Sequence, residues 1–248
     1  MESVLKPSAY LYLIFLFFLI YLVREKYFHG FFLPAAQKIR KNFLYILLFL
    51  MVTLFTIFLL DGPLMSFIKT HRSKFAEGIA GIGNILGKGD MFIFSFPVTA
   101  FVIAMLFKKE YYQKVFALSA ASAFFSGILV QALKVIFARA RPCAGVSHLS
   151  FFNWDKVFAG EKLFNADFLS MASGDVITAM SLCVPLFYFS KHRLIRCIFL
   201  LIPLFVCFGR LYSLAHWASD VFVALGIGAF IGIVFCEKYG KDLVTVHA

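Results

Sequence analysis

Long apolar runs are the feature that most limits what this chain of 248 residues can fold into. A hydrocarbon core about 30 Å thick is crossed by helices of about 17–25 mainly apolar residues. Hydrophobic residues make up 62% of the chain and charged residues only 15%, whereas soluble domains carry about 25% charged residues. Because the apolar excess is gathered into runs, the sequence predicts an all-α, polytopic membrane protein.

Six apolar runs are candidate membrane spans, and a seventh precedes them. The six are Phe43–Leu60, Met91–Phe107, Val115–Ile136, Val176–Phe189, Leu194–Phe208 and Val221–Cys236. The preceding run, Ala9–Val23, has no Ala-x-Ala-like cleavage site, so we do not expect a removed signal peptide. It either spans the bilayer or lies along the interface. We therefore expect residues 1–42 to form an N-terminal apolar helix with a basic cytoplasmic segment, and residues 43–248 to form a six-span helical bundle.

The charges of the connecting segments predict the orientation of the spans, because basic loops stay in the cytoplasm. Basic residues crowd three connections that lie on one side by parity, namely residues 24–41, 108–114 and 191–196. The opposite side then holds residues 61–90, 137–173 and 209–216. In a bacterium this orientation places the protein in the inner membrane, with those three segments facing the periplasm.

The formal charge of +11 is expected to set topology and to contact anionic lipid headgroups. Nucleic acid is not an expected partner, since the cations lie in short loops without a recognition motif. No feature of the sequence indicates an oligomeric state.

Residues 78–90, GIAGIGNILGKGD, contain several glycines but match no nucleotide-binding motif. Gly81, Gly83 and Gly87 miss the dinucleotide spacing, and Gly89 follows Lys88 where a Walker loop needs Ser or Thr. We expect a flexible external loop here, with or without a short interfacial helix. Other small residues, in Val115–Ile136 and in Gly228-x3-Gly232, are expected to allow close packing of helices.

Three polar clusters interrupt the apolar pattern, each at the periplasmic end of a predicted span. They are Lys134-x6-Arg141-Pro142, Ser173-Gly174-Asp175 and Arg210-x5-His216-x3-Asp220. Charged side chains beside hydrocarbon are costly and usually mark a functional site. Three cations on one rim favour a substrate with several negative oxygens, and phosphate fits best.

The third cluster has the spacing of an oriented histidine. His216 and Asp220 are four residues apart, so they are neighbours on one face of a helix. A carboxylate there can accept from one ring nitrogen and leave the other nitrogen free as a base or nucleophile. The alternative is a buried structural pair. Arg210 can return to the same pocket and grip phosphate through two hydrogen bonds.

The first two clusters are weaker signals when each is taken alone. If the helix continues through Arg141, Lys134 and Arg141 face the same way and Arg139 points elsewhere; the alternative is a positive helix end at the headgroup layer. Ser173 and Gly174 offer a hydroxyl and backbone N–H groups at a helix N-terminus, which favours anions. The alternative for this pair is an ordinary helix start.

Taken together, the clusters resemble the membrane branch of the type 2 phosphatidic acid phosphatase superfamily. The pattern of that family is Lys-x6-Arg-Pro, then Pro-Ser-Gly-His, then Ser-Arg-x5-His-x3-Asp, and residues 134–220 have its order and spacing. The resemblance implies a six-helix core in which His216 attacks phosphorus, forms a phosphohistidine and is oriented by Asp220. It also implies that the phosphoryl oxygens are held by Lys134, Arg141, Arg210 and Ser173, with neither metal nor other cofactor.

Three positions depart from that pattern. Ala172 replaces proline, Gly209 replaces serine, and Asp175 replaces the histidine that serves the family as general acid. A carboxylic acid ordinarily has a pKa near 4, so at neutral pH it holds no proton to give. Four accounts are open: a pKa of Asp175 raised by burial and substrate, an auxiliary proton from His148, a leaving group that needs little help, or an introduced substitution. We favour the first two; a solvated loop histidine is the alternative for His148.

The resemblance therefore implies an integral membrane lipid phosphatase with a phosphorylated membrane lipid as substrate. Lipid A is favoured because residues 143–172 offer Lys156, Lys162, Trp154 and several Phe residues to a bulky headgroup. Undecaprenyl pyrophosphate and phosphatidylglycerophosphate are alternative substrates. Alternative functions are lipid-to-lipid phosphotransfer and lipid binding without catalysis.

Overall fold

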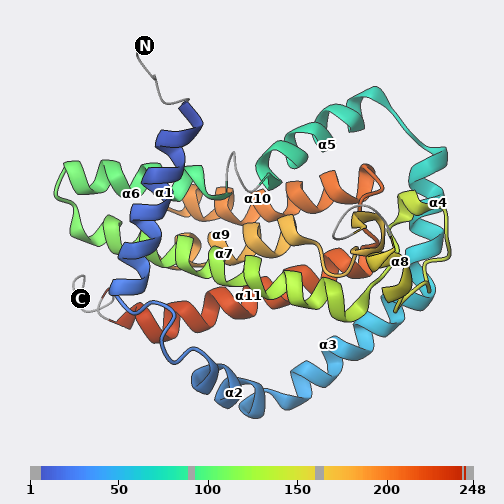
Figure 1. Cartoon of the computed structure of the whole chain (residues 1–248), viewed down its shortest axis with the longest axis horizontal. Helices are drawn as coiled ribbons and strands as arrows, with labels where there is room; N and C mark the ends of the chain where they lie inside the picture. Colours follow the sequence, from blue (N-terminus) through green and yellow to red (C-terminus); the bar gives the residue numbers. More distant parts are fainter. Residues whose placement is uncertain (1–6, 89–92, 160–164, 242, 244–248) are drawn as a thin grey trace.

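The computed structural model describes residues 7–88, 93–159, 165–241 and 243, and among them it contains helices and no strands (Figure 1). The predicted all-α fold class is confirmed. Four helices lie side by side as a core, α7 (Glu110–Phe137), α9 (Gly174–Phe189), α10 (Arg193–Tyr212) and α11 (Ala218–Tyr239).

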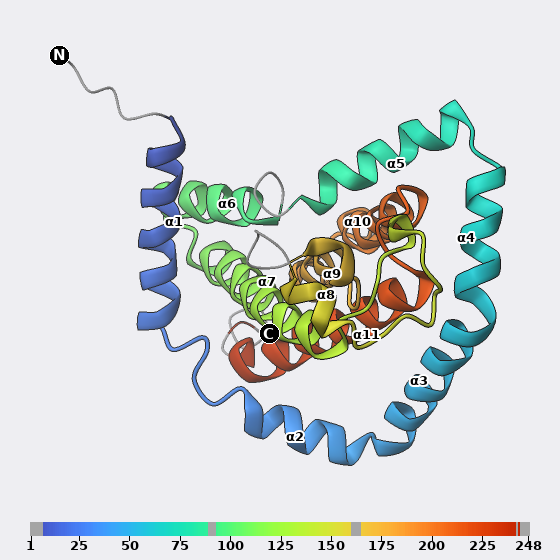
Figure 2. The same ribbon diagram turned by 45° about the vertical axis from the view of Figure 1, so that its right-hand side comes forward.

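The first half of the chain surrounds this core. Figure 2 shows an arc formed by α1 (Pro7–Arg24), α2 (Phe32–Lys41), α3 (Phe43–Phe55), α4 (Asp61–Thr70) and α5 (Lys74–Gly87). A π-helical turn, Thr56–Leu60, joins α3 to α4, and α6 (Ser95–Leu106) packs beside α7. Three short helical segments lie between α7 and α9: Pro142–Ala144, α8 (Trp154–Phe158) and Ala166–Phe168.

Within the described residues, four helical segments are long and apolar enough to cross a membrane: Phe43–Thr70, Glu110–Ala144, Arg193–Tyr212 and Ala218–Tyr239. Two further apolar helices, α6 and α9, are shorter, with 12 and 16 residues. Each of the six predicted spans overlaps one of these helices, although Met91, the first residue of the second span, lies outside the described residues. Six crossings, and the question whether α1 spans or lies along the interface, remain predictions.

Small residues bring α9 close to its neighbours, as the sequence predicts. The Ser126 and Ser181 hydroxyls are 2.6 Å apart between α7 and α9. On α11, a Cβ at Gly228 would lie 2.7 Å from the Ile177 carbonyl oxygen, and one at Gly232 would lie 2.6 Å from the Val184 Cβ. These glycines are required by the close approach of two helix backbones.

Helix α5 covers residues 74–87, so most of residues 78–90 form a helix, which was allowed as part of the loop expected there; Gly89 and Asp90 lie outside the described residues. This helix packs along α10. A Cβ at Gly83 would lie 1.9 Å from the Phe205 carbonyl oxygen, and one at Gly209 would lie 2.8 Å from the Ala80 carbonyl oxygen. The departure from the family pattern at Gly209 therefore has a structural explanation, because the side chain of a serine at this position would collide with the backbone of α5.

Candidate active site

The first cluster is positioned by the end of α7. That helix stops at Phe137, because Ala138 takes a left-handed conformation with φ of 39°. Arg141 then has extended backbone, the conformation that a following proline favours. Lys134 and Arg141 therefore do not share a continuous helix face. Instead, the Arg141 N–H donates to the Asp167 carbonyl at 2.7 Å, which holds Arg141 in place after the turn.

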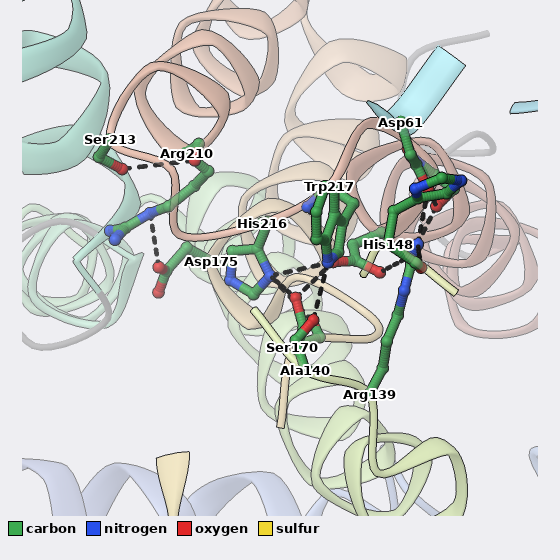
Figure 3. A network of polar contacts seen from close by, with 12 residues as sticks. Asp61, Arg139, Ala140, His148, Ser170, Asp175, Arg210, Ser213, His216 and Trp217 are labelled. Atoms are coloured by element: carbon green, nitrogen blue, oxygen red, sulfur yellow. Dashed lines mark hydrogen bonds and ion pairs between the residues drawn. The ribbon is translucent and has the colours of Figure 1, made fainter. Parts of the chain in front are cut away.

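His216 lies in the turn between α10 and α11 and is 3% exposed. Its Nδ1 lies 2.8 Å from the main-chain carbonyl oxygen of Ser170 (Figure 3). Because a carbonyl only accepts, Nδ1 carries the proton and Nε2 keeps its lone pair free for chemistry. The same Nδ1 is 3.8 Å from Asp220 Oδ2, which is too far for a hydrogen bond.

The direct acceptor of the imidazole proton is thus Ser170, not Asp220. Asp220 acts one step away: its Oδ2 accepts from the Ser170 hydroxyl at 2.5 Å and from the Trp217 N–H at 2.9 Å. It thereby fixes both segments that hold the histidine and places a negative charge beside the ring. Sequence reasoning missed Ser170 because its contact with His216 is made by the main chain, which carries no residue-type signal.

Two cations of the clusters, Lys134 and Arg141, lie near this histidine, and Arg210 lies near Lys134. The charges of Lys134 and Arg141 act on His216, and those of Arg141 and Arg210 act on Lys134. A Cβ at Gly174 would lie 3.4 Å from Lys134 Nζ, so the ammonium lies against the first residue of α9.

Ser173 precedes α9 and is fully buried. Within the described part of the chain, its Oγ and the Nε of Arg141 are buried and have no hydrogen-bond partner. Buried polar atoms are almost always satisfied, so these two groups are available for a ligand. The arrangement can surround an oxyanion.

Asp175, the departure from the family pattern, forms an ion pair with Arg210: Asp175 Oδ2 is 2.7 Å from Arg210 Nε (Figure 3). The pair is partly exposed, with 33% of the Asp175 side chain and 18% of the Arg210 side chain accessible. Helix α5 backs it, since a Cβ at Gly87 would lie 3.2 Å from the Asp175 Cβ. The Asp175 carboxylate is therefore bound to Arg210, one of the three cations predicted to bind phosphate.

His148 is not brought beside His216. Its ring lies 6.0 Å from the Trp217 ring, and Figure 3 shows Trp217 between the two histidines. A Cβ at Gly62 would lie 3.4 Å from the His148 ring. The contacts described for the His148 imidazole are with Trp217 and Gly62, and none is with another predicted site residue.

Arg139, which we expected to point away from Lys134 and Arg141, is fully buried. It forms ion pairs of 2.6 Å with both Asp61 and Asp220. Neither Asp61 nor Arg139 was assigned a role from the sequence. The available signal was that each charge directly follows or closely follows an apolar run, the setting in which ionisable residues are usually functional.

Burial lowers the pKa of His216 below its usual value, and the charges of Arg141 and Lys134 lower it further, whereas Asp220 opposes them. The net direction is downward, because removal from water disfavours the imidazolium form. His216 is therefore neutral at pH 7. A neutral ring with a free Nε2 is the form that can act as a nucleophile.

The segment predicted to meet a headgroup is only partly described. Trp154 is exposed, with its Nε1 donating to the Val135 carbonyl at 2.8 Å. Lys156 Nζ lies 5.3 Å from the centre of the Phe168 ring. Lys162 lies outside the described residues. Nowhere in the described ranges are three His, Cys, Asp or Glu side chains grouped as metal ligands would be.

Comparison with known proteins gives one family and one structure. The family model of the PAP2 superfamily matches residues 114–242, more than half of the chain. The comparison with curated proteins finds no match. The crystal structure of LpxE from Aquifex aeolicus is similar with a TM-score of 0.53 and 24% sequence identity, over 73% of this chain and 96% of that one. At this identity the likeness concerns the fold. The three polar clusters all fall inside the residues matched by the family model, whereas α1–α6 precede them.

Proposed function

This chain belongs to the PAP2 superfamily, and from that membership we propose that it is an integral membrane phosphatase that removes a phosphate from a lipid headgroup through a phosphohistidine on His216. One observation carries the proposal: a buried, neutral imidazole presents a free Nε2 where Lys134 and Arg141 act on it and the Ser173 hydroxyl is unpaired. Phosphoryl transfer needs an in-line nucleophile and positive charge around the equatorial oxygens.

The proposed reaction has two steps. First, the substrate phosphate displaces Asp175 from Arg210, and Asp175 takes up a proton beside the anionic substrate. The Nε2 lone pair then forms a bond to phosphorus while the bond from phosphorus to the lipid oxygen breaks, and that oxygen takes the electron pair and the proton of Asp175. Second, water attacks phosphorus and gives a proton to the Asp175 carboxylate while the bond from phosphorus to Nε2 breaks, so inorganic phosphate leaves and the neutral imidazole is restored. The cations and the N-terminus of α9 stabilise the negative charge in both steps.

Lipid A is the proposed substrate, and the bacterial inner membrane with the site facing the periplasm is the proposed location. The location is supported by the basic connections before α7 and α10, which lie at the opposite end of the core from the turn between α10 and α11 (Figure 1). The substrate is supported by the exposed Phe152 and Trp154 close in sequence to the site. We further propose that the reaction proceeds without a metal ion, since Lys134 and Arg141 can hold the phosphoryl oxygens, together with Arg210 once phosphate has displaced Asp175 from it.

The deciding experiment is phosphate release by the purified full-length protein in detergent with EDTA present. Lipid A, undecaprenyl pyrophosphate and phosphatidylglycerophosphate, each labelled in the phosphate, are supplied separately. Release of free phosphate from lipid A supports the proposal, whereas label on a second lipid identifies a phosphotransferase. Equal inactivity of the wild type and His216→Ala on all three lipids between about pH 4 and pH 8 contradicts the enzymatic function.

The acid limb of the pH profile should lie below pH 6.5, the usual pKa of histidine. His216 must be neutral to attack, and its pKa is lowered by burial and by Arg141 and Lys134. Activity is therefore retained as the pH falls through 6.5 and is lost only at the lower pKa. We expect this from kcat/KM measured at fixed ionic strength. His71→Gln removes an exposed histidine and should leave the limb in place; an acid limb at or above 6.5 argues against a buried neutral nucleophile.

Asp175→Asn should lower KM by up to about fivefold, because the phosphate no longer competes with a carboxylate for Arg210. This modest size reflects the partial exposure of the pair. In the same variant, kcat should fall if Asp175 supplies the proton to the leaving oxygen. Asp175→His restores the acid of the family and should retain or raise activity near neutral pH. Complete loss of activity in a folded Asp175→His protein would show that the carboxylate has a task that histidine cannot perform.

A further inference from the structure

A buried group of four side chains connects the first half of the chain to the candidate active site. We call it the ionic cluster; its members, Asp61, Arg139, Ser219 and Asp220, are all 0% exposed. Asp61 is the first residue of α4 and lies outside the residues matched by the PAP2 family model. The other three lie within the matched residues. The cluster is therefore assembled from both parts of the protein.

The contacts of Asp61 are short and use both of its oxygens. Its Oδ2 accepts from Arg139 Nη2 at 2.6 Å and from the Ser219 hydroxyl at 2.5 Å. Its Oδ1 accepts from the Ser219 backbone N–H at 2.9 Å. Asp61 thus holds the guanidinium of Arg139 and the first turn of α11 at the same time.

Arg139 connects Asp61 to Asp220 by contacting both carboxylates. Its Nη1 donates to Asp220 Oδ1 at 2.6 Å, while Nη2 contacts Asp61. Aromatic rings enclose the guanidinium, whose central carbon is 4.5 Å from the centre of the Phe151 ring and 5.5 Å from that of Trp217. The other oxygen of Asp220 lies 3.8 Å from His216 Nδ1. A continuous chain of ion pairs therefore runs from Asp61 to Asp220, whose carboxylate lies beside the imidazole.

The charges of the cluster do not cancel. Asp61 and Asp220 each carry one negative charge and Arg139 carries one positive charge, so one negative charge is left in a site closed to water. Burying an unbalanced charge is costly unless another group uses it. The imidazole of His216 is that group. It becomes positively charged when Nε2 bonds to phosphorus, because Nδ1 keeps the proton that it donates to the Ser170 carbonyl.

We propose that Asp61 is a positioning residue whose carboxylate neutralises Arg139, so that Asp220 keeps its full negative charge toward His216. The chemical step in this inference rests on the proposed function, whereas the electrostatic link does not. Without Asp61, Arg139 and Asp220 form a neutral pair, and His216 loses the charge that stabilises its cationic form.

Other charged groups also face the imidazole and are unchanged by this substitution. Lys134, at the end of α7, and Arg141, after the turn, act against the cationic form, and Asp220 on α11 acts for it. Arg210 on α10 is paired with Asp175 on α9. Because these groups stay in place, a change in the titration of His216 on removal of Asp61 reports on the cluster itself.

The test is a titration of the His216 ring by NMR on full-length protein with labelled histidine in detergent micelles, with the signal assigned through His216→Ala. Asp61→Asn should lower the pKa of His216 by about one pH unit, the size expected for loss of one charge about 10 Å away. Asp61→Ser removes the same charge but leaves a small hydroxyl, and should give the same shift. The double variant Asp61→Asn/Arg139→Gln restores the charge balance and should return the pKa to within about 0.3 units of wild type.

The matched control is Asp155→Asn, which removes an exposed carboxylate of α8 and should shift nothing, because water screens that charge. In turnover assays, Asp61→Asn should lower kcat by about threefold to tenfold, because the His216 imidazole becomes a weaker base and hence a weaker nucleophile. KM should change little. An unshifted His216 titration in folded Asp61→Asn and Asp61→Ser proteins overturns the inference, even if their thermal stability falls. If the wild type releases no phosphate, the proposed function fails, but the titration still decides the role of Asp61.

Discussion

His216→Ala is expected to lower phosphate release by more than about 10⁴-fold, the scale seen when a covalent nucleophile is removed. The variant keeps Lys134, Arg141 and Arg210, so lipid binding should persist and the loss should appear in kcat. The physical reason is that the cations only stabilise charge, whereas the bond to phosphorus needs the free Nε2. Circular dichroism and the elution of the detergent-solubilised protein check that the fold is retained.

The covalent intermediate gives this prediction a second readout. Wild-type protein mixed with lipid labelled in the phosphate and quenched in alkali should carry label, since phosphohistidine survives alkali and is lost in acid. His216→Ala should carry none. His148→Gln is the matched control, because it removes an imidazole that lies on the other side of Trp217 from the site, and it should be labelled like wild type. A His148→Gln protein without activity would return His148 to the list of proton donors.

Gly83→Ala is expected to be the most damaging small substitution outside the polar clusters. Alanine in a helix is normally favoured over glycine by about 0.5–1 kcal/mol. Here its Cβ would lie 1.9 Å from the Phe205 carbonyl oxygen, so α5 must move away from α10. Overpacking of this kind costs about 1–3 kcal/mol, which corresponds to a Tm lower by about 2–10 °C. Because Gly87 of the same helix backs the pair of Asp175 and Arg210, activity should fall as well.

Gly78→Ala and Gly81→Ala supply the controls on the same helix. A Cβ at either position would meet nothing within 4 Å, so both substitutions should be neutral or slightly stabilising. Thermal unfolding of the detergent-solubilised proteins at one scan rate compares the three variants. A Gly83→Ala protein as stable and active as Gly81→Ala would show that α5 does not pack against α10 in this way.

Several features followed from local sequence patterns. The apolar runs predicted helices, and helices overlap all six predicted spans. Ser173 and Gly174 predicted a helix start, and α9 begins at Gly174. The spacing from Lys134 to Asp220 predicted the family, which the match over residues 114–242 confirms. These inferences succeeded because hydropathy, helix capping and motif spacing depend on residues that are near one another along the chain.

The glycines of residues 78–90 show where such patterns fail. By composition they were typical of a flexible loop, yet one of them, Gly83, allows α5 to contact α10 backbone to backbone. Glycine has the same local signal in both settings. Only the partner helix, more than a hundred residues later in the chain, distinguishes a mobile segment from a tightly packed one.

The sequence alone predicted helices apolar enough to cross a membrane and a histidine site directed at phosphate, because burial in lipid and the spacing of charged residues leave local traces. The tertiary structure decided how that histidine is held. Its proton is accepted by the Ser170 main chain, and the neighbouring Asp220 carboxylate is held by Arg139, whose partners Asp61 and Asp220 are 78 and 81 residues away in the chain. Such contacts are made by packing between helices, so no periodicity or spacing along the sequence specifies them.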